Sequence, residues 1–180
     1  MSVSGSCYCG AVKVTCTGEP KVMAVCHCRS CAKVRRLLKS IRCSFPPNIR
    51  QINNLHDPFP LARQWGSINL ATLYPCDQVK VEGELVEFTN PPPEGKPKGS
   101  NRKTCAKCHS NVLNDHPDTM GLTDIVSGIL EQEFKPGMHI NYAEATWKVN
   151  DDLPKFADFP AEMGGSGKML DNAGNPIASP

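Results

Sequence analysis

Residues 25–31 read VCHCRSC, which places cysteines at positions 26, 28 and 31 within one short segment. Two further groups lie on either side of it: SCYCG at residues 6–10 and TCAKC at residues 104–108. Cysteines this close form strained disulfides, but they can direct their sulfurs at one metal ion. The three groups therefore predict a fold organised by metal coordination.

The seven grouped cysteines divide into four plus three. The C-x-C and C-x-x-C pairs can close a four-sulfur structural zinc site that joins early and late parts of the chain, with ligands Cys7, Cys9, Cys105 and Cys108. The remaining triplet consists of Cys26, Cys28 and Cys31. A catalytic zinc keeps one position open, and three sulfurs leave such a position.

Two alternatives to this division stay open. All seven cysteines can be structural, in one or two zinc ribbons whose fourth ligand the sequence does not reveal. His27 can also be the fourth ligand of the triplet, although the cysteines on both sides of it already point at the metal.

Composition limits the function classes. The 180 residues carry 20 basic and 18 acidic side chains, a net charge of +2, which argues against nucleic-acid binding driven by bulk charge. The start of the sequence does not resemble a secretion signal, and no apolar run is long enough to span a membrane. Ten cysteines in such a chain indicate metal ligands or catalytic thiols in the reducing cytoplasm.

Hydrophobic periodicity predicts mostly strands. Residues 11–17 alternate apolar and polar side chains, and residues 21–26 form an apolar run after a turn. We therefore expect a hairpin with a metal knuckle, a short turn that carries closely spaced cysteine ligands, at each end. Further strands are expected at 67–73, 78–88 with a break at Gly83, 110–114, 124–130 and 138–142. Residues 30–41 show the one helical pattern.

Three motifs carry a family resemblance. The segments GSCYCGAVKV (5–14), VCHCRSCAKV (25–34) and GSNRKTCAKCHSNVL (99–113) resemble the glutathione-dependent formaldehyde-activating enzyme family, also called the centromere protein V domain. The segment HINYAEATWKVNDDLPKFADFP (139–160) with the following GGSG is similar to fungal members. The resemblance covers roughly residues 4–33 and 66–167.

The resemblance implies an all-β fold of small coiled antiparallel sheets, a zinc-ribbon-like sandwich around two zinc ions. It assigns the structural ion to Cys7, Cys9, Cys105 and Cys108, and the catalytic ion to Cys26, Cys28 and Cys31. It also implies a carbon–sulfur lyase or synthase that acts on adducts of glutathione with formaldehyde, or with a bulkier electrophile. Two other function classes remain: a non-catalytic zinc-ribbon binding module, and a redox or metal sensor that uses the triplet thiols.

The expected domain is 1–163, followed by a disordered tail over 164–180. Residues 34–63 depart from the family pattern, in which the triplet runs almost directly into the next strand. This insertion can be a lid specific to one lineage, or translated intron sequence. Sequencing the mature transcript separates the two, because an intact insertion in the message removes the intron hypothesis.

Two residues are candidates to assist catalysis. Arg29 flanks the triplet and can pair with a glutathione carboxylate, or it can be an ordinary surface arginine. His139 is a candidate acid/base on a strand whose other face carries Tyr142; the alternative is a structural histidine satisfied within the protein. The oligomeric state is left open.

Overall fold

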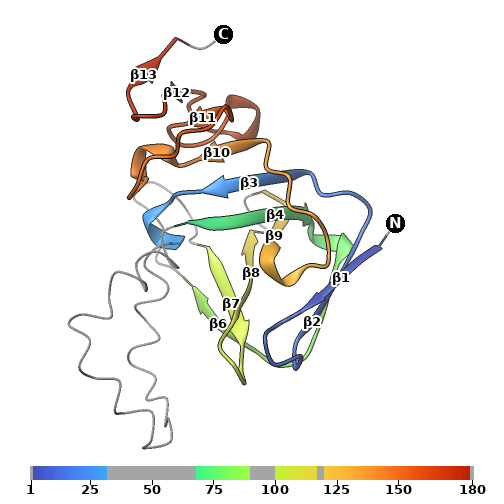
Figure 1. Cartoon of the computed structure of the whole chain (residues 1–180). Helices are drawn as coiled ribbons and strands as arrows, with labels where there is room; N and C mark the ends of the chain where they lie inside the picture. The colour runs from blue at the N-terminus through green and yellow to red at the C-terminus, as the bar shows by residue number, and fades with distance from the viewer. Residues whose placement is uncertain (1, 32–67, 90–99, 117–119, 179–180) are drawn as a thin grey trace, which may run out of the picture. The chain divides into compact units, whose positions relative to one another are not determined.

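The computed structural model describes residues 2–31, 68–89, 100–116 and 120–178 (Figure 1). The chain divides into two compact units: Met1–Ala24 with Leu70–Gly137, and Val25–Asn69 with Met138–Pro180. The single domain over 1–163 stays a prediction. The chain leaves the first compact unit after Ala24 and returns to it at Leu70. The four knuckle cysteines lie in the first unit and the triplet in the second.

Strands dominate the described residues, which confirms the all-β expectation. The first unit contains the strands β1 (Ser2–Ser6), β2 (Lys13–Thr17), β4 (Asn69–Pro75), β5 (Val79–Glu82), β6 (Leu85–Thr89), β7 (Asn101–Cys105), β8 (Asn111–His116) and β9 (Leu122–Val126). Two 3-10 segments, η2 (Cys76–Gln78) and η3 (Ser127–Ile129), follow β4 and β9. The strand expected over 124–130 therefore ends at Val126.

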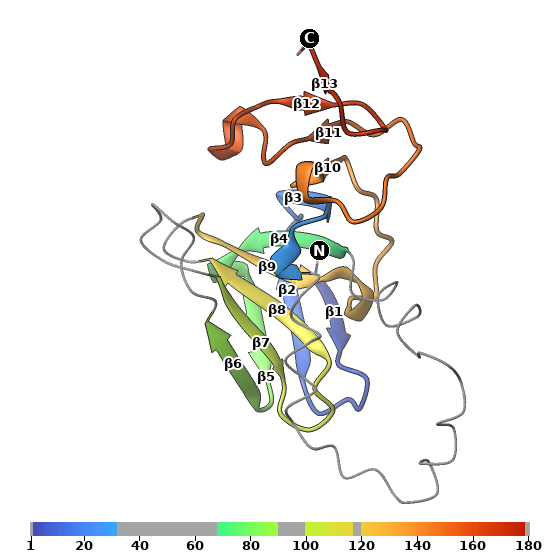
Figure 2. The same cartoon turned by 90° about the vertical axis from the view of Figure 1, so that its left-hand side faces the viewer.

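Two antiparallel sheet regions form the first unit. One has the strand order β1-β2-β5, and the other has the order β4-β9-β8-β7-β6. Figure 2 shows β6, β7 and β8 side by side. The register between β7 and β8 shifts at Lys103 and Thr104, just before Cys105 ends β7. This bulge bends the chain just before the turn that carries Cys105 and Cys108.

The predicted hairpin between residues 11–17 and 21–26 is wrong, although both strands exist. Strand β2 pairs with β1 and β5, whereas β3 (Val22–Cys26) has β4 as a neighbour. Gly18 adopts a left-handed conformation with φ 76°, and the amide of Lys21 then donates to the carbonyl of Leu73 at 2.8 Å. The turn thus passes the chain from one sheet region to the other.

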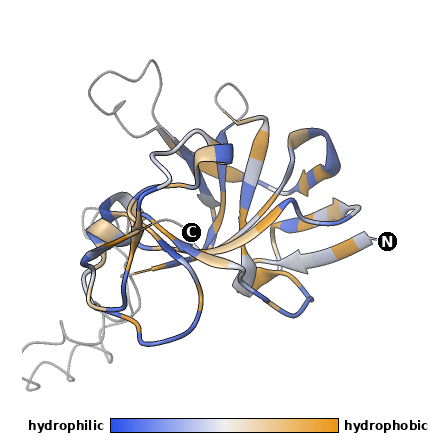
Figure 3. Cartoon of the chain, turned by 90° about the horizontal axis from the view of Figure 1, so that it is seen from above, coloured by the Kyte–Doolittle hydropathy of each residue, from blue (hydrophilic) through white to orange (hydrophobic). Residues whose placement is uncertain are grey.

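The core of the first unit follows the expected alternation. In β2, Val14 and Cys16 are buried while Lys13, Thr15 and Thr17 are exposed, and Figure 3 shows apolar and polar residues alternating along the strands. The buried cluster comprises Cys7, Val12, Val14, Cys16, Tyr74, Cys105, Val112, Leu113, Ile125 and Leu130. Two of the knuckle cysteines therefore belong to the hydrophobic core.

The described part of the second unit contains very short strands: β10 (Met138–Ile140), β11 (Lys155–Phe156), β12 (Met169–Leu170) and β13 (Pro176–Ile177). Strands β10 and β11 are parallel, and the next two pairs are antiparallel. The end of β3 adjoins β10, where the amide of His27 donates to the carbonyl of Ile140 at 3.0 Å. The 3-10 segments are η4 (Tyr142–Glu144) and η5 (Ala161–Met163).

The expectation of a disordered tail from residue 164 is wrong, because β12 and β13 lie within it. The Gly-rich turn before β12 is held by Asp158, whose carboxylate accepts hydrogen bonds from the amide and the hydroxyl of Ser166, the latter at 2.6 Å. These bonds satisfy polar groups that a glycine-rich sequence would otherwise leave to solvent.

The helix expected over 30–41 and the insertion over 34–63 lie outside the described residues from position 32 onward. Within the described part of the chain, none of the helices combines the length and hydrophobicity needed to cross a lipid bilayer.

Gly83 interrupts the run 78–88 as predicted, between β5 and β6, with φ 109°. We expect Gly83→Ala to lower the free energy of unfolding of the first unit by at least about 3 kcal/mol, because a side chain is strained at this φ and its Cβ would overlap the carbonyl of Ala11. Gly121→Ala is the matched control, with φ 64° and open space, and should cost about 1 kcal/mol. Equal losses in urea unfolding would contradict the packing argument.

Candidate metal centres

The four knuckle sulfurs converge in the first unit. The ligand atoms of Cys7, Cys9, Cys105 and Cys108 all lie within 4.8 Å of one another. The Sγ of Cys9 is 3.6 Å from that of Cys7 and 3.8 Å from that of Cys105. A tetrahedral zinc ion with Zn–S bonds of about 2.3 Å needs sulfurs about 3.8 Å apart, so these four residues fit a closed structural site.

Backbone amides support the sulfurs of this cluster. The amide of Val12 donates to Cys7 Sγ at 3.3 Å, and the amide of Lys107 donates to Cys105 Sγ at 3.4 Å. Each knuckle then turns at a residue with positive φ, Gly10 at 72° and His109 at 57°. N–H donors stabilise negative charge on sulfur, so the turns are suited to thiolates.

Two thiols of this cluster have strongly altered pKa values. The backbone amide of Ala11 lowers the pKa of Cys9, but burial and the neighbouring thiols outweigh it and raise the value to about 11. Burial raises the pKa of Cys108, but hydrogen bonds with Ser110 and Cys9 outweigh it and lower the value to about 5. The hydroxyl of Ser110 lies 3.1 Å from Cys108 Sγ. A thiol that ionises this readily is suited to binding a cation.

The triplet forms a smaller cluster in the second unit. Cys26 ends β3, and its Sγ is 4.0 Å from that of Cys31, which in turn is 3.2 Å from that of Cys28. Cys26 is buried, whereas Cys28 and Cys31 are partly exposed. Among the described residues, no fourth histidine, cysteine or carboxylate joins the cluster.

Two neighbouring thiols oppose the ionisation of Cys26. The pKa of Cys26 is raised well above its usual value by Cys28 and Cys31 first, and by burial in addition. A divalent cation removes this conflict, because it balances the negative charge of the thiolates that bind it. The donor set of the triplet therefore fits a thiophilic ion such as zinc, with three protein ligands.

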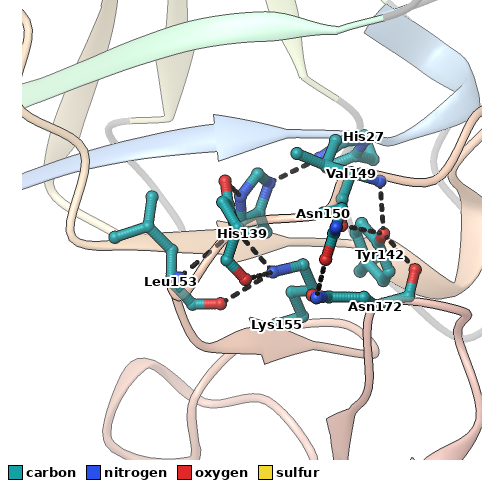
Figure 4. Close-up of polar contacts among 9 residues, drawn as sticks. His27, His139, Tyr142, Val149, Asn150, Leu153, Lys155 and Asn172 are labelled. Carbon is teal, nitrogen blue, oxygen red and sulfur yellow. Dashed lines mark hydrogen bonds and ion pairs between the residues drawn. The ribbon is translucent and has the colours of Figure 1, made fainter.

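A buried polar network packs next to the triplet segment (Figure 4). His27 Nε2 lies 2.8 Å from His139 Nδ1, and His139 Nε2 lies 2.9 Å from a carboxylate oxygen of Asp151. Lys155 donates to the other oxygen of Asp151 at 2.6 Å. Burial raises the pKa of Asp151, but the hydrogen bonds from Lys155 and His139 outweigh it and lower the value to about 2. The carboxylate is therefore ionised at neutral pH.

The network fixes where the histidine protons lie. Because the carboxylate of Asp151 only accepts, a neutral His139 carries its proton on Nε2 and accepts at Nδ1. His27 must then donate from Nε2, which leaves its Nδ1 as a buried acceptor with no partner among the described residues. His139 has both ring nitrogens engaged and is only 2% exposed. This geometry favours the structural alternative for His139 over the acid/base role.

The placement of Tyr142 on the face opposite His139 is wrong. Strand β10 ends at Ile140, and Asn141 turns the chain with φ 54°. The ring of Tyr142 consequently packs against those of His139 and His27, with centroids 5.7 and 5.0 Å away. Its hydroxyl accepts from the amide of Val149 at 2.7 Å and donates to the carbonyl of Asn172 at 2.9 Å (Figure 4). Tyr142 is therefore a structural residue of the second unit.

Two side chains that contact the triplet segment could not be predicted from the sequence pattern. Asn141 donates from Nδ2 to Cys26 Sγ at 3.5 Å, and the carboxylate of Glu144 accepts from the amide of Arg29 at 2.6 Å. The side chain of the candidate residue Arg29 is exposed beside the triplet. The one local signal for Asn141 was its residue type, since asparagine tolerates left-handed backbone better than most residues.

Burial lowers the pKa of His27 to about 4, with the nearby charges of Lys148 and Lys155 adding to the effect. A group whose pKa falls on folding destabilises the fold as it becomes protonated, so this part of the stability is present above about pH 6.5 and is lost toward pH 4. Between pH 7 and pH 5, we expect the free energy of unfolding of the wild type to fall by about 2 kcal/mol more than that of His27→Gln. Urea unfolding of both proteins at both pH values, with zinc in excess, measures this difference. An equal fall in the free energy of unfolding of the two proteins would contradict the prediction.

The fold and the two cysteine clusters define a β-rich protein with two sites suited to zinc. Residues 2–49 match the family model described as glutathione-dependent formaldehyde-activating enzyme, and this confirms the family resemblance for the N-terminal part of the chain. The matched segment contains Cys7, Cys9 and the whole triplet. It also overlaps residues 34–49 of the segment treated as an insertion. No curated protein matches the chain.

Proposed function

We propose that the protein is a zinc-dependent carbon–sulfur lyase or synthase that acts on glutathione adducts of formaldehyde or of a bulkier electrophile. The observation that carries this proposal is the difference between the two clusters. Four sulfurs enclose one site, whereas the other offers three, two of them on partly exposed cysteines. The family match adds the glutathione-related class of substrate.

The proposed reaction is the addition of a thiol to a carbonyl group, or its reverse. In the forward direction the sulfur of glutathione bonds to the carbonyl carbon, the carbon–oxygen π bond breaks, and the thiol proton ends on the oxygen. A zinc ion held by Cys26, Cys28 and Cys31 would supply an open coordination position for the sulfur or oxygen of the adduct. No oxidant or further reactant is required.

The remaining residues have roles in binding and positioning. Arg29 is exposed and lies between Cys28 and Cys31 in the sequence, and its guanidinium would pair with a carboxylate of glutathione. His139, bonded on both sides, would orient His27 and with it the segment between Cys26 and Cys28. Free thiols in both clusters require a reducing compartment, which supports the cytoplasm as the site of action.

The proposal is tested by loading the full chain with zinc and incubating it with glutathione and formaldehyde, then with a panel of glutathione adducts. Adduct formation or cleavage is followed by mass spectrometry. Turnover that Cys28→Ser abolishes supports the lyase. If the protein binds two zinc ions but no adduct reacts, the non-catalytic zinc-ribbon module is favoured. One zinc ion and a Cys28–Cys31 disulfide formed in air favour the sensor, because these sulfurs lie only 3.2 Å apart.

A further inference from the structure

A strained turn follows β10 and faces the triplet segment. Asn141 has φ 54° and ψ 34°, a left-handed conformation that is unfavourable for residues other than glycine. Backbone hydrogen bonds hold it there: its amide donates to the carbonyl of Asp158 at 2.6 Å, and its carbonyl accepts from the amide of Glu144 at 3.0 Å. Strain that the surroundings maintain in this way often marks a functional position.

The turn places two side chains on the triplet segment. The side-chain amide of Asn141 donates from Nδ2 to Cys26 Sγ at 3.5 Å, and the two residues are 115 positions apart in the sequence. The carboxylate of Glu144 accepts from the amide of Arg29 at 2.6 Å. The turn therefore contacts the triplet segment at two points, the sulfur of Cys26 and the backbone amide of Arg29, which directly follows Cys28.

Cys26 differs from the other two ligands in its surroundings. It is the most buried of the three, with 7% of its surface exposed, and its sulfur receives a side-chain donor. Cys28 Sγ receives a backbone donor from within the triplet itself, the amide of Cys31 at 3.3 Å. A donor to a bound thiolate withdraws charge from the sulfur and fixes its direction, and such partners often change metal affinity 10–100-fold.

We propose that Asn141 is a positioning residue of the triplet: its side-chain amide holds Cys26 in the ligating orientation and thereby sets how slowly this site releases its metal ion. This rests on the proposed zinc binding by the triplet. The left-handed backbone of Asn141 directs its side-chain amide at the sulfur of Cys26. The hydrogen-bond donor determines the rate of metal release, and the backbone strain results from placing that donor.

The experiment measures zinc release to an excess of a chromogenic chelator, with the four-sulfur site as internal reference. Asn141→Gly keeps the left-handed backbone without strain and removes the amide. Asn141→Asp keeps the shape and replaces the donor by a negative charge. We expect the triplet to release zinc at least tenfold faster in the glycine variant and faster still in the aspartate variant. The slow phase of the four-sulfur site should stay unchanged.

Asn172→Ala is the matched control, since its amide contacts Asn150 in the same unit and should leave both phases as in the wild type. Cobalt substitution supplies a second measurement, because loss of the donor should shift the sulfur-to-cobalt charge-transfer band of the triplet site. Release rates within twofold of the wild type in both Asn141 variants, with an unshifted band, overturn the inference. A wild type with only one zinc ion per chain would instead overturn the proposed function, and this inference with it.

Discussion

Replacing Cys105 with serine will prevent the first unit from folding. Its sulfur is fully buried, belongs to the hydrophobic core and lies 3.8 Å from that of Cys9. A structural zinc ion supplies roughly 10–16 kcal/mol of apparent binding free energy, as much as the whole stability of a typical domain. Loss of one ligand should therefore expose the strands that the ion holds together.

Hydrogen exchange followed by mass spectrometry checks this expectation unit by unit. In Cys105→Ser, peptides from residues 70–89 and 100–116 should lose their protection, and treatment of the wild type with a strong chelator should have the same effect. Cys76→Ser is the matched control, because this partly exposed cysteine lies in η2 outside both clusters. Unchanged protection in Cys105→Ser would show that the four sulfurs do not stabilise the fold through a metal.

Cys28→Ser should give the opposite pattern, with the fold preserved and turnover lost. Cys28 is partly exposed and does not belong to the core cluster of the first unit. We expect the zinc content to fall from two ions per chain to one and the rate of adduct conversion to fall at least 100-fold, since the triplet would no longer hold the ion that supplies an open coordination position. Elemental analysis and the mass-spectrometric assay measure the two effects on the same sample.

The comparison between the two serine variants decides whether the clusters have different roles. Exchange protection in Cys28→Ser should match the wild type in the first unit. If the two variants unfold the chain equally, the triplet is structural and its assignment as a catalytic site is wrong. Cys76→Ser again controls for the chemical change itself and should keep both zinc ions and full turnover.

The grouping of the cysteines could be predicted because knuckle spacing is a local property. Sulfurs two or three residues apart can reach one ion whatever the rest of the chain does. The joining of two such pairs across 96 positions followed instead from the four ligands that a closed zinc site needs, and the structure brings the four and the three sulfurs together as two clusters. Strand β2 was likewise visible from its alternation of apolar and polar residues, and β3 was visible as an apolar run. The break at Gly83 was visible because glycine interrupts an otherwise regular pattern.

Pairing and long-range polar contacts could not be predicted in the same way. Strand β1 reads SVSGS and β7 reads NRKTC, and neither shows the apolar alternation of a strand. One of the two partners of β2, the strand β1, therefore remained hidden. The contact between His27 and His139 joins residues 112 positions apart. It lies where the end of β3 adjoins β10, next to the hydrogen bond from the amide of His27 to the carbonyl of Ile140. The turn at Asn141 then brings Tyr142 to the same side as His139.

Cadmium-113 NMR of the fully loaded protein tests the central claim most directly, because the shift of each ion reports how many sulfurs bind it. We expect two resonances of equal intensity. One should have a chemical shift in the four-sulfur range, and that shift should not change when glutathione is added. The other should lie in the three-sulfur range and move toward the four-sulfur range as the thiol binds. A single resonance, or two four-sulfur resonances before any thiol is added, would contradict the account.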